Sequence, residues 1–295
     1  MNEKELFQIV GIRPAELKSS LKKRRHPKMP AVSIVLLGLI ILCCLFAGFL
    51  TDKDPSYLDL ANCAKPPDRE FLFGTDTLGR DIFSCIWYGG RISLFIGFSA
   101  TAISTLIAVV YGSVSGIAPA WVDTILMRLT EIFLSVPTLL IIIFIQSIAG
   151  NPSVLSISIA IGITNWCSIA KIIRTEVRQI RGSEYVIASR CMGGSFFHVL
   201  RRHLAPNFVS SIMFMVIMNI RSAIVFESTL SFMGMGLPLE SISWGSMLSL
   251  AEKALMTRAW WIILIPGAFL VTLLMRMTNL GNWLRKSVNQ KESYF

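Results

Sequence analysis

Charged residues are scarce in this sequence. Asp, Glu, Lys and Arg make up 16% of the 295 residues, whereas soluble domains carry about 25%. Hydrophobic residues account for 53%, and the mean hydropathy is +0.61. So many apolar side chains exceed what one buried core can hold, which excludes an ordinary soluble domain. They fit helices whose outer faces contact lipid.

Motifs for nucleotide binding and hydrolysis are also missing. No Gly is followed by Lys, so the chain has no GxxxxGK(S/T) loop, and neither HExxH nor GxSxG occurs. The three histidines all lie outside the long apolar runs: His26, His198 and His203. An intramembrane enzyme would need a nucleophile and a base within the bilayer. We therefore expect that this chain is not an enzyme.

Cysteine is limited to six residues, which form no CxxC motif. Without such a motif or a histidine pair a zinc site is not expected, and we predict no metal and no cofactor on this chain. Cys43, Cys44 and Cys167 lie in apolar runs and are expected to be packing residues. Cys63 and Cys85 share one connection, and the sequence leaves open whether they form a disulfide.

Six apolar runs are present that can cross a membrane, since about 20 residues of helix span roughly 30 Å of hydrocarbon. The third run is the least regular, because Glu131 opens it and Pro137 lies inside it. Membrane helices tolerate proline where neighbouring helices satisfy the freed carbonyl. The predicted fold is therefore an all-α polytopic membrane protein with about six transmembrane helices. The expected spans are 31–50, 92–116, 132–149, 154–173, 209–230 and 261–280.

The distribution of basic residues predicts the orientation of these helices, because Lys and Arg collect on the cytoplasmic side. Basic clusters lie in residues 1–30, 174–207 and 283–295, whereas the connection 51–91 is acidic on balance. Six spans also place both termini on one side. We expect both termini in the cytoplasm. The net charge of +10 then reflects membrane topology rather than nucleic-acid binding.

Two ionisable residues, Arg221 and Glu227, lie within the fifth predicted span. A charge in the membrane interior costs about 2.5 kcal/mol or more, so both side chains should face protein or water. Six helical residues separate them by about 240°, so they do not share one stripe. They are either hydrogen-bonding groups between helices or a polar lining of a translocation path, and the sequence favours neither.

The second predicted span contains a GxxxG pattern formed by Gly112 and Gly116. Small residues at this spacing let two helices approach closely. Because glycine is common in membrane helices, we interpret the pattern as helix packing with no chemistry attached.

The most informative stretch is EYVIASRCMGGSFFHVLRRHLAPN, residues 184–207. It combines apolar groups on a short helix, a glycine that can break it, an N-cap for a second short helix and a proline after that helix. These residues are Tyr185 and Ala188, Gly193, Ser195 and Pro206. Two angled helices with apolar residues suit docking into the groove of a partner. An amphipathic helix on lipid headgroups is the alternative, since such helices are also rich in Arg and aromatic residues.

The same stretch resembles the EAA loop of binding-protein-dependent ABC permeases. That pattern has an acidic residue, a pair of small residues, a Gly a few positions on and a hydrophobic–Pro ending. Four residues stand in matching places: Glu184, Ala188, Gly193 and Pro206. His203 and Asn207 match the dipeptide/oligopeptide/nickel branch. Ser189 replaces the usual second Ala, and Ala205 stands where Leu or Ile often precedes the Pro.

Two further stretches resemble the same branch: FGTDTLGRDIFSCIWYGGRISLFIG at 73–97, and LSFMGMGLP at 230–238 followed by SWGSML. In the first, Gly74, Asp76 and Gly79 also favour turns. The resemblance implies a type I ABC importer permease fold. Its expected parts are a cytoplasmic tail, first helix and external loop at 1–90, a permease domain at 91–282 with the cytoplasmic loop 174–207, and a cytoplasmic tail at 283–295.

The resemblance implies a division of labour. The EAA loop would be a coupling helix in a groove of a cytoplasmic ATPase, with Glu184 as the docking acid, Gly193 as the bend, and Tyr185 and Ala188 as contacts. ATP and Mg²⁺ would bind to two separate ATPase subunits. A second homologous permease subunit would complete the pathway, and an external binding protein would deliver the solute. The location would be a prokaryotic cell membrane.

The branch handles di- and oligopeptides, and also nickel or metal chelates. The spans contain no His or Cys cluster that favours bare metal, so we predict peptide, with nickel or a chelate as the alternative. An ion-coupled secondary transporter is the alternative of another class. Such transporters often contain inverted repeats, and this sequence shows no internal repeat.

Overall fold

The computed structural model describes residues 29–182, 184–193, 205–238, 240–250, 254 and 258–292. Apart from one isolated antiparallel bridge between Thr75 and Asp81, the regular elements in this part are helices. The helices are α1 (Ala31–Leu45), α2 (Ala47–Leu50), η2 (Leu60–Asn62), α3 (Ile82–Ile117), α4 (Ala120–Ser135), α5 (Thr138–Ala149), α6 (Val154–Gly162), α7 (Cys167–Ile180), α8 (Glu184–Cys191), α10 (Ala205–Phe232), α11 (Trp244–Ser249) and α13 (Trp261–Glu292).

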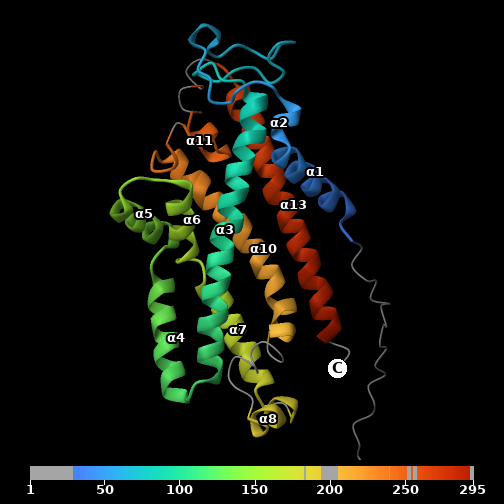
Figure 1. Cartoon of the computed structure of the whole chain (residues 1–295), viewed down its shortest axis with the longest axis vertical. Helices are drawn as coiled ribbons and strands as arrows, with labels where there is room; N and C mark the ends of the chain where they lie inside the picture. Colours follow the sequence, from blue (N-terminus) through green and yellow to red (C-terminus); the bar gives the residue numbers. More distant parts are fainter. Residues whose placement is uncertain are drawn as a thin grey trace, which may run out of the picture.

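The long helices run along the long axis of the molecule (Figure 1). α10 packs against both α3 and α13, and α3 also packs against α6 and α7. The connection 51–81 and helix α11 lie at the upper end of the view, and α8 lies at the lower end. We call these the upper and lower ends below. The last helical residues of α13 lie toward the lower end.

Three helices, α3, α10 and α13, are long and apolar enough to cross a membrane. Two bent pairs, α4 with α5 and α6 with α7, pass the same test together. α1 is a shorter apolar helix of 15 residues. The prediction of an all-α multi-pass membrane protein is confirmed, with three straight candidate spans, two bent ones and the shorter α1 in the described part.

The third predicted span, 132–149, is wrong as a single helix. α4 ends before Pro137 and α5 begins after it, with a bend of 87° between them. Val136 is extended, with φ −93° and ψ 132°, because the ring of a following proline disfavours the helical conformation. The helical stretch before the proline begins at Ala120, twelve residues ahead of the prediction.

The fourth predicted span, 154–173, is divided into α6 and α7 with a bend of 43°. At the break, the Thr164 hydroxyl donates back to the carbonyl oxygens of Ala160 (3.0 Å) and Ile161 (2.9 Å), a contact that often bends helices. The side-chain amide of Asn219 on α10 donates to the Asn165 carbonyl oxygen at 3.1 Å. Neighbouring elements thus satisfy the backbone at the bend.

The first predicted span, 31–50, is interrupted at Phe46, between α1 and α2. The guanidinium of Arg91 on α3 donates to the carbonyl oxygens of Cys44 (3.0 Å) and Leu45 (2.8 Å). Because these carbonyls have another donor, they do not need the amide groups of a continuing helix.

The second predicted span, 92–116, is part of a longer helix. α3 contains 36 residues and begins at Ile82. The carboxylate of Asp81 caps it by accepting from the backbone amide (2.9 Å) and the hydroxyl (2.6 Å) of Ser84. The prediction began too late because Arg91 interrupts the apolar run, although its charge is directed to the α1 carbonyls.

The GxxxG pattern is confirmed as a packing surface. A Cβ atom on Gly112 would lie 2.6 Å from the carbonyl oxygen of Ala170, and one on Gly116 would lie 2.6 Å from Val177. Both neighbours belong to α7. The lower half of α3 and α7 therefore pack at close backbone distance.

We expect Gly112→Ala to lower the thermal stability of the purified protein, because the new Cβ would press on backbone atoms rather than on a side chain that can move. Overpacking of this kind costs about 1–3 kcal/mol. Gly38→Ala is the matched control, since Gly38 lies in α1 with no atom within 4 Å of an added Cβ. Thermal unfolding in detergent measures both, and equal melting temperatures would contradict the close α3–α7 contact.

Cys63 and Cys85 are both free thiols. Cys85 is buried, and its thiol donates to the Pro55 carbonyl oxygen at 3.7 Å, whereas Cys63 is exposed. No disulfide joins these two residues.

Candidate functional site

Helix α8, the beginning of the EAA-like stretch, lies at the lower end directly after α7 (Figure 1). Glu184 is in its first turn and is exposed. Gly193 follows α8 with φ +84°, and among the described residues no atom lies within 4 Å of a Cβ added there. L side chains rarely adopt such a conformation, so the backbone at the end of α8 favours glycine at this position. Two apolar side chains, Ile187 and Met192, are 50% and 83% exposed.

Other predicted residues of this stretch are only partly visible. Ser195 and His203 lie outside the described residues, as do the side chains of Tyr185 and Ala188. Pro206 is the second residue of α10. Proline is tolerated in the first turn of a helix, where no amide donor is needed. Pro206 therefore marks the start of a long helix.

The end of α7, which leads directly into α8 and which we call the stem of α8, is held by a polar cluster that was not predicted from the sequence. Asp123, in the first turn of α4, is 4% exposed. Its carboxylate accepts hydrogen bonds from the Ser115 hydroxyl (2.6 Å) and the Arg174 guanidinium (Nη2, 2.6 Å), and it forms an ion pair with the Arg178 guanidinium (2.9 Å). Ser115 is on α3 and both arginines are on α7. In the sequence, the cluster is indicated only by an acidic residue at the start of an apolar run, because the two arginines lie more than 50 residues away along the chain.

A second buried carboxylate belongs to Glu227 of α10, which is 0% exposed. It accepts hydrogen bonds from the hydroxyl groups of Ser243 (2.6 Å), Ser231 (3.0 Å) and Ser93 (3.4 Å). Ser93 is on α3, and Ser243 is the N-cap of α11. Glu227 thus joins α3, α10 and the start of α11, and it brings together the two stretches that begin at 230 and 243.

The neighbours of Glu227 leave little space. The backbone amide of Trp244 donates to the Ser93 hydroxyl at 3.1 Å, and its indole donates to the Ile86 carbonyl oxygen at 2.8 Å. A Cβ atom on Gly245 would lie 2.9 Å from the Glu227 carboxylate. The fully buried Trp244 and the serine hydroxyls therefore hold α11 against α3 and α10.

Arg221 does not meet Glu227 in the described part of the chain. Among the described residues no ion pair joins them, and Arg221 instead lines a groove of about 240 Å³ between α10 and α13. Thr278 and Asn279 are polar residues of the same groove, and Val271 is among its apolar ones. Arg221 is half-buried.

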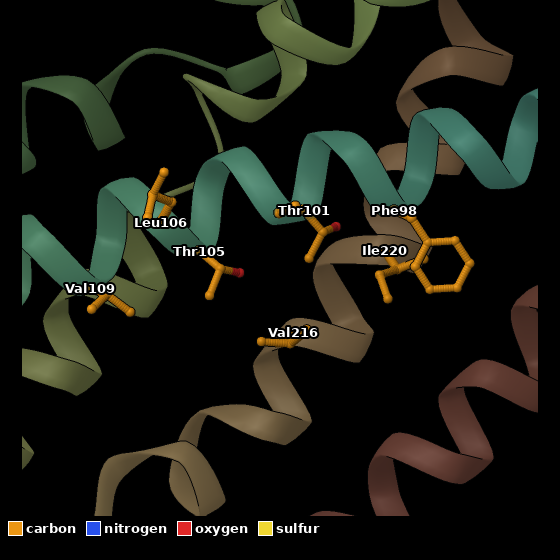
Figure 2. A pocket seen from close by; sticks show the side chains of 8 residues that line it. Phe98, Thr101, Thr105, Leu106, Val109, Val216 and Ile220 are labelled. Carbon is orange, nitrogen blue, oxygen red and sulfur yellow. The ribbon is translucent and has the colours of Figure 1, made fainter. Parts of the chain in front are cut away.

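A larger groove of about 530 Å³ lies on the other side of α10, against α3 (Figure 2). Thr101 and Thr105 of α3 and Val216 and Ile220 of α10 contribute to it. Within the part of the chain that the structure describes, the hydroxyl oxygens of both threonines are buried and have no hydrogen-bond partner. The wall of the larger groove is therefore almost entirely apolar, whereas the smaller groove includes Arg221, Thr278 and Asn279.

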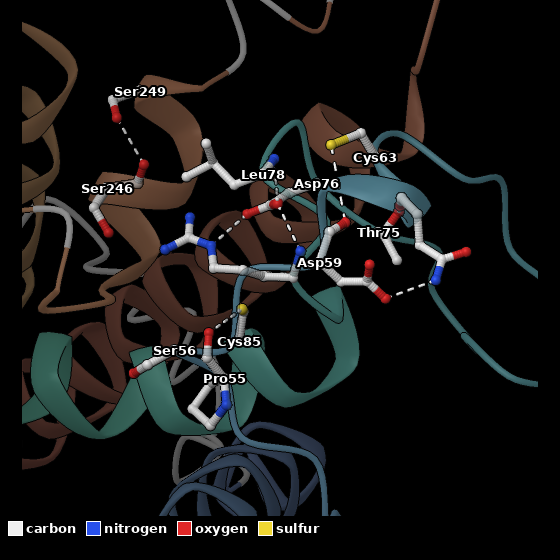
Figure 3. A network of polar contacts seen from close by, with 12 residues as sticks. Pro55, Ser56, Asp59, Cys63, Thr75, Asp76, Leu78, Cys85, Ser246 and Ser249 are labelled. Carbon is white, nitrogen blue, oxygen red and sulfur yellow. Dashed lines mark hydrogen bonds and ion pairs between the residues drawn. The ribbon is translucent and has the colours of Figure 1, made fainter.

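The upper end contains a polar network (Figure 3). The buried side chains of Asp76 and Arg80 form an ion pair of 2.7 Å, and Asp76 also accepts from the backbone amide of Leu78 at 2.8 Å. Gly74 and Gly79 have φ values of +74° and +78°. The turns predicted from this stretch are confirmed, and they close the connection over the start of α3.

Comparison with known proteins agrees with this architecture. Residues 108–289 match the family described as "Binding-protein-dependent transport system inner membrane component". The oligopeptide transport system permease protein OppC of Bacillus subtilis (strain 168) is 36% identical over 274 residues, which cover 93% of this chain and 89% of that protein. The dipeptide transport system permease protein DppC of the same organism is 36% identical over 270 residues, covering 92% and 84%.

A putative peptide permease protein of Brucella suis biovar 1 (strain 1330) is 32% identical over 262 residues, covering 87% of this chain and 86% of that protein. The similarity thus extends over nearly the whole chain and includes α1 and the connection that follows it. The chain belongs to the family of binding-protein-dependent transport system inner membrane components.

Proposed function

We propose that this chain is a permease subunit of an ATP-driven importer that takes up di- or oligopeptides. The family match over residues 108–289 carries the proposal. The names of the relatives, oligopeptide, dipeptide and peptide permeases, support peptide over nickel or a metal chelate. The family also supports an ABC importer over an ion-coupled secondary transporter.

The remaining components would be separate polypeptides. The sequence has no P-loop, so two cytoplasmic ATPase subunits would bind ATP and Mg²⁺. A second homologous permease subunit would complete the pathway, and an external binding protein would deliver the peptide. α8 would dock in a groove of one ATPase, because an exposed acid, Glu184, stands beside the exposed apolar side chains of Ile187 and Met192.

The proposed orientation places the lower end in the cytoplasm of a prokaryotic cell, with both termini on that side. α7 and the last turns of α13 lie toward the lower end (Figure 1). The α7 region carries Arg174, Arg178 and Arg181, and the last turns of α13 carry Arg285 and Lys286. This bias is typical of cytoplasmic ends of membrane proteins. The acidic connection 51–81 would face the outside.

The grooves beside α10 are the proposed lining of the pathway or of the contact with the second permease subunit. Arg221 supports this, because an arginine within a span needs water or protein rather than lipid.

The coupling role is tested with the double variant Glu184→Ala/Gly193→Asp. The chain is co-expressed with candidate ATPase and permease subunits, and subunit association and ATPase activity are measured. We expect the variant to enter the membrane and to lose at least about tenfold in ATPase association or coupling, since a hot-spot residue of an interface contributes about 2 kcal/mol or more.

The matched control is Glu131→Ala/Gly150→Asp. Glu131 is also an exposed glutamate, and Gly150 has φ +80° with no atom within 4 Å of an added Cβ, like Gly193. The control should assemble and couple as the wild type does. A loop variant that assembles and couples normally would exclude residues 184–207 as the coupling element.

A further inference from the structure

We propose that Asp123 is a positioning residue for coupling: its carboxylate ties the stem of α8 to the corner between α3 and α4, so that α4 moves together with α8. This inference rests on the proposed function, because it assigns α8 to the contact with an ATPase. Asp123 itself would touch neither ATP nor peptide.

The contact is multiple and directional. The Arg174 side chain approaches both carboxylate oxygens of Asp123, Nε to Oδ1 at 2.5 Å and Nη2 to Oδ2 at 2.6 Å. Arg178 adds an ion pair with Oδ2 at 2.9 Å, and the Ser115 hydroxyl adds a hydrogen bond to Oδ1 at 2.6 Å. Two-pronged arginine–carboxylate pairs define orientation as well as distance.

The location of the cluster links it to α8. α7 ends at Ile180, and α8 begins at Glu184, so only three residues separate them. Arg178 is two positions from the end of α7, and Arg181 donates to the Gly116 carbonyl oxygen of α3 at 3.0 Å. The end of α7 cannot shift without moving these bonds.

α4 depends on this cluster more than its neighbours do. Asp123 and Thr130 are the buried residues of α4. Other attachments are a hydrogen bond of 2.6 Å from the Tyr111 hydroxyl on α3 to the Leu126 carbonyl oxygen, and a contact between the rings of Phe133 and Trp166, whose centroids lie 6.0 Å apart. By contrast, α7 is held to α3 by the close packing at Gly112 and Gly116. Loss of Asp123 would therefore remove the polar contacts that join the start of α4 to the end of α7, while α3 and α7 remain packed.

The electrostatic balance supports a role for the charge itself. One carboxylate faces two guanidinium groups whose side chains are 23% and 37% exposed. Asp123→Asn keeps the shape and removes the charge, which leaves two partly buried cations facing one another. Asp123→Glu keeps the charge and should restore much of the function.

The experiment uses the complete transporter with its ATPases, second permease subunit and binding protein, reconstituted in vesicles. The measured quantity is the number of ATP molecules hydrolysed per peptide imported. We expect Asp123→Asn to raise this ratio roughly fivefold or more, the low end of typical coupling between sites, and Asp123→Glu to recover most of it. The control, Glu131→Gln, breaks the exposed Arg128–Glu131 pair on the same helix and should leave the ratio unchanged.

A second measurement follows the distance between spin labels at exposed positions on α4 and in the turn just before α8, Ile125→Cys and Gly182→Cys. The exposed Cys63 and Cys191 are replaced by Ser. In the wild-type background the distance should stay constant between the nucleotide-free and ATP-bound states. In the Asp123→Asn background it should change between these states.

The outcomes separate this inference from the proposed function. If the wild-type complex shows no peptide-stimulated ATPase activity, the proposed function fails. If the wild type couples and Asp123→Asn couples equally well, the positioning role is excluded. If Asp123→Asn only lowers yield and melting temperature, while assembled complexes keep the wild-type ratio and a constant label distance, Asp123 is merely structural and the inference is overturned.

Discussion

Replacing Glu227 by alanine should destabilise the protein strongly and abolish most peptide transport. The substitution removes the acceptor shared by Ser93, Ser231 and Ser243 and leaves a void beside Trp244. Each buried polar group left without a partner costs about 1–3 kcal/mol, so we expect a loss of about 3 kcal/mol or more in the free energy of unfolding. Because α11 would lose the part of its attachment to α3 and α10 that passes through Glu227, transport should fall at least about tenfold, an effect equivalent to 1.4 kcal/mol.

Two further variants make this result interpretable. Glu227→Gln retains one acceptor oxygen in nearly the same volume, so its stability should lie between those of wild type and alanine variant. Glu131→Ala removes an exposed glutamate from α4, whose pairing with Arg128 is exposed and contributes little. Thermal unfolding and peptide uptake are measured for all three. If Glu227→Ala unfolds at the wild-type temperature, the serine contacts do not hold α11.

The second large effect is expected for Gly79→Val at the upper end. Gly79 has φ +78°, and a Cβ atom there would lie 1.8 Å from the backbone oxygen of Asp59. A left-handed conformation alone costs an L residue about 1–2 kcal/mol, and the clash with the backbone cannot be relieved by a side-chain rotation. We expect a total cost above about 4 kcal/mol, which is exceptional for one substitution, and little folded protein after purification.

A control substitution at Gly150 separates the cost of the left-handed backbone conformation from the cost of the steric clash. It has a similar φ of +80°, but no atom lies within 4 Å of an added Cβ, so Gly150→Val has the conformational cost without the collision. The yield and melting temperature of this control should fall only modestly. Equal losses at both positions would indicate that backbone conformation, and not the contact with Asp59, governs the upper end.

The sequence predicted the helical fold and the approximate spans because hydropathy depends on residues close together along the chain. It also located Arg221, Glu227 and the start of the EAA-like stretch. The bends were missed for local reasons: Pro137 was expected to be tolerated within a helix, and Thr164 bends its helix through back-bonding that hydropathy does not register.

Contacts between residues that lie far apart along the chain could not be predicted from the sequence. Glu227 was recognised as a buried polar group, but its partners Ser93 and Ser243 come from two other elements. Asp123 attracted no attention because its partners, Arg174 and Arg178, are more than fifty residues away, and nothing in the local pattern pairs them. Asp123 becomes part of a polar cluster only because the packing of α7 on α3 places both arginines beside its carboxylate.

The length of α3 has a mechanical consequence. Its 36 residues extend over about 54 Å, while the hydrocarbon core is roughly 30 Å thick. One uninterrupted hydrogen-bond ladder therefore reaches from the Asp81 cap, past Ser93, to Ser115 at the opposite end. A rod anchored at both extremities transmits tilt and displacement rather than absorbing them. α3 therefore couples the upper and lower ends of the protein mechanically, so that a displacement of one end also displaces the other.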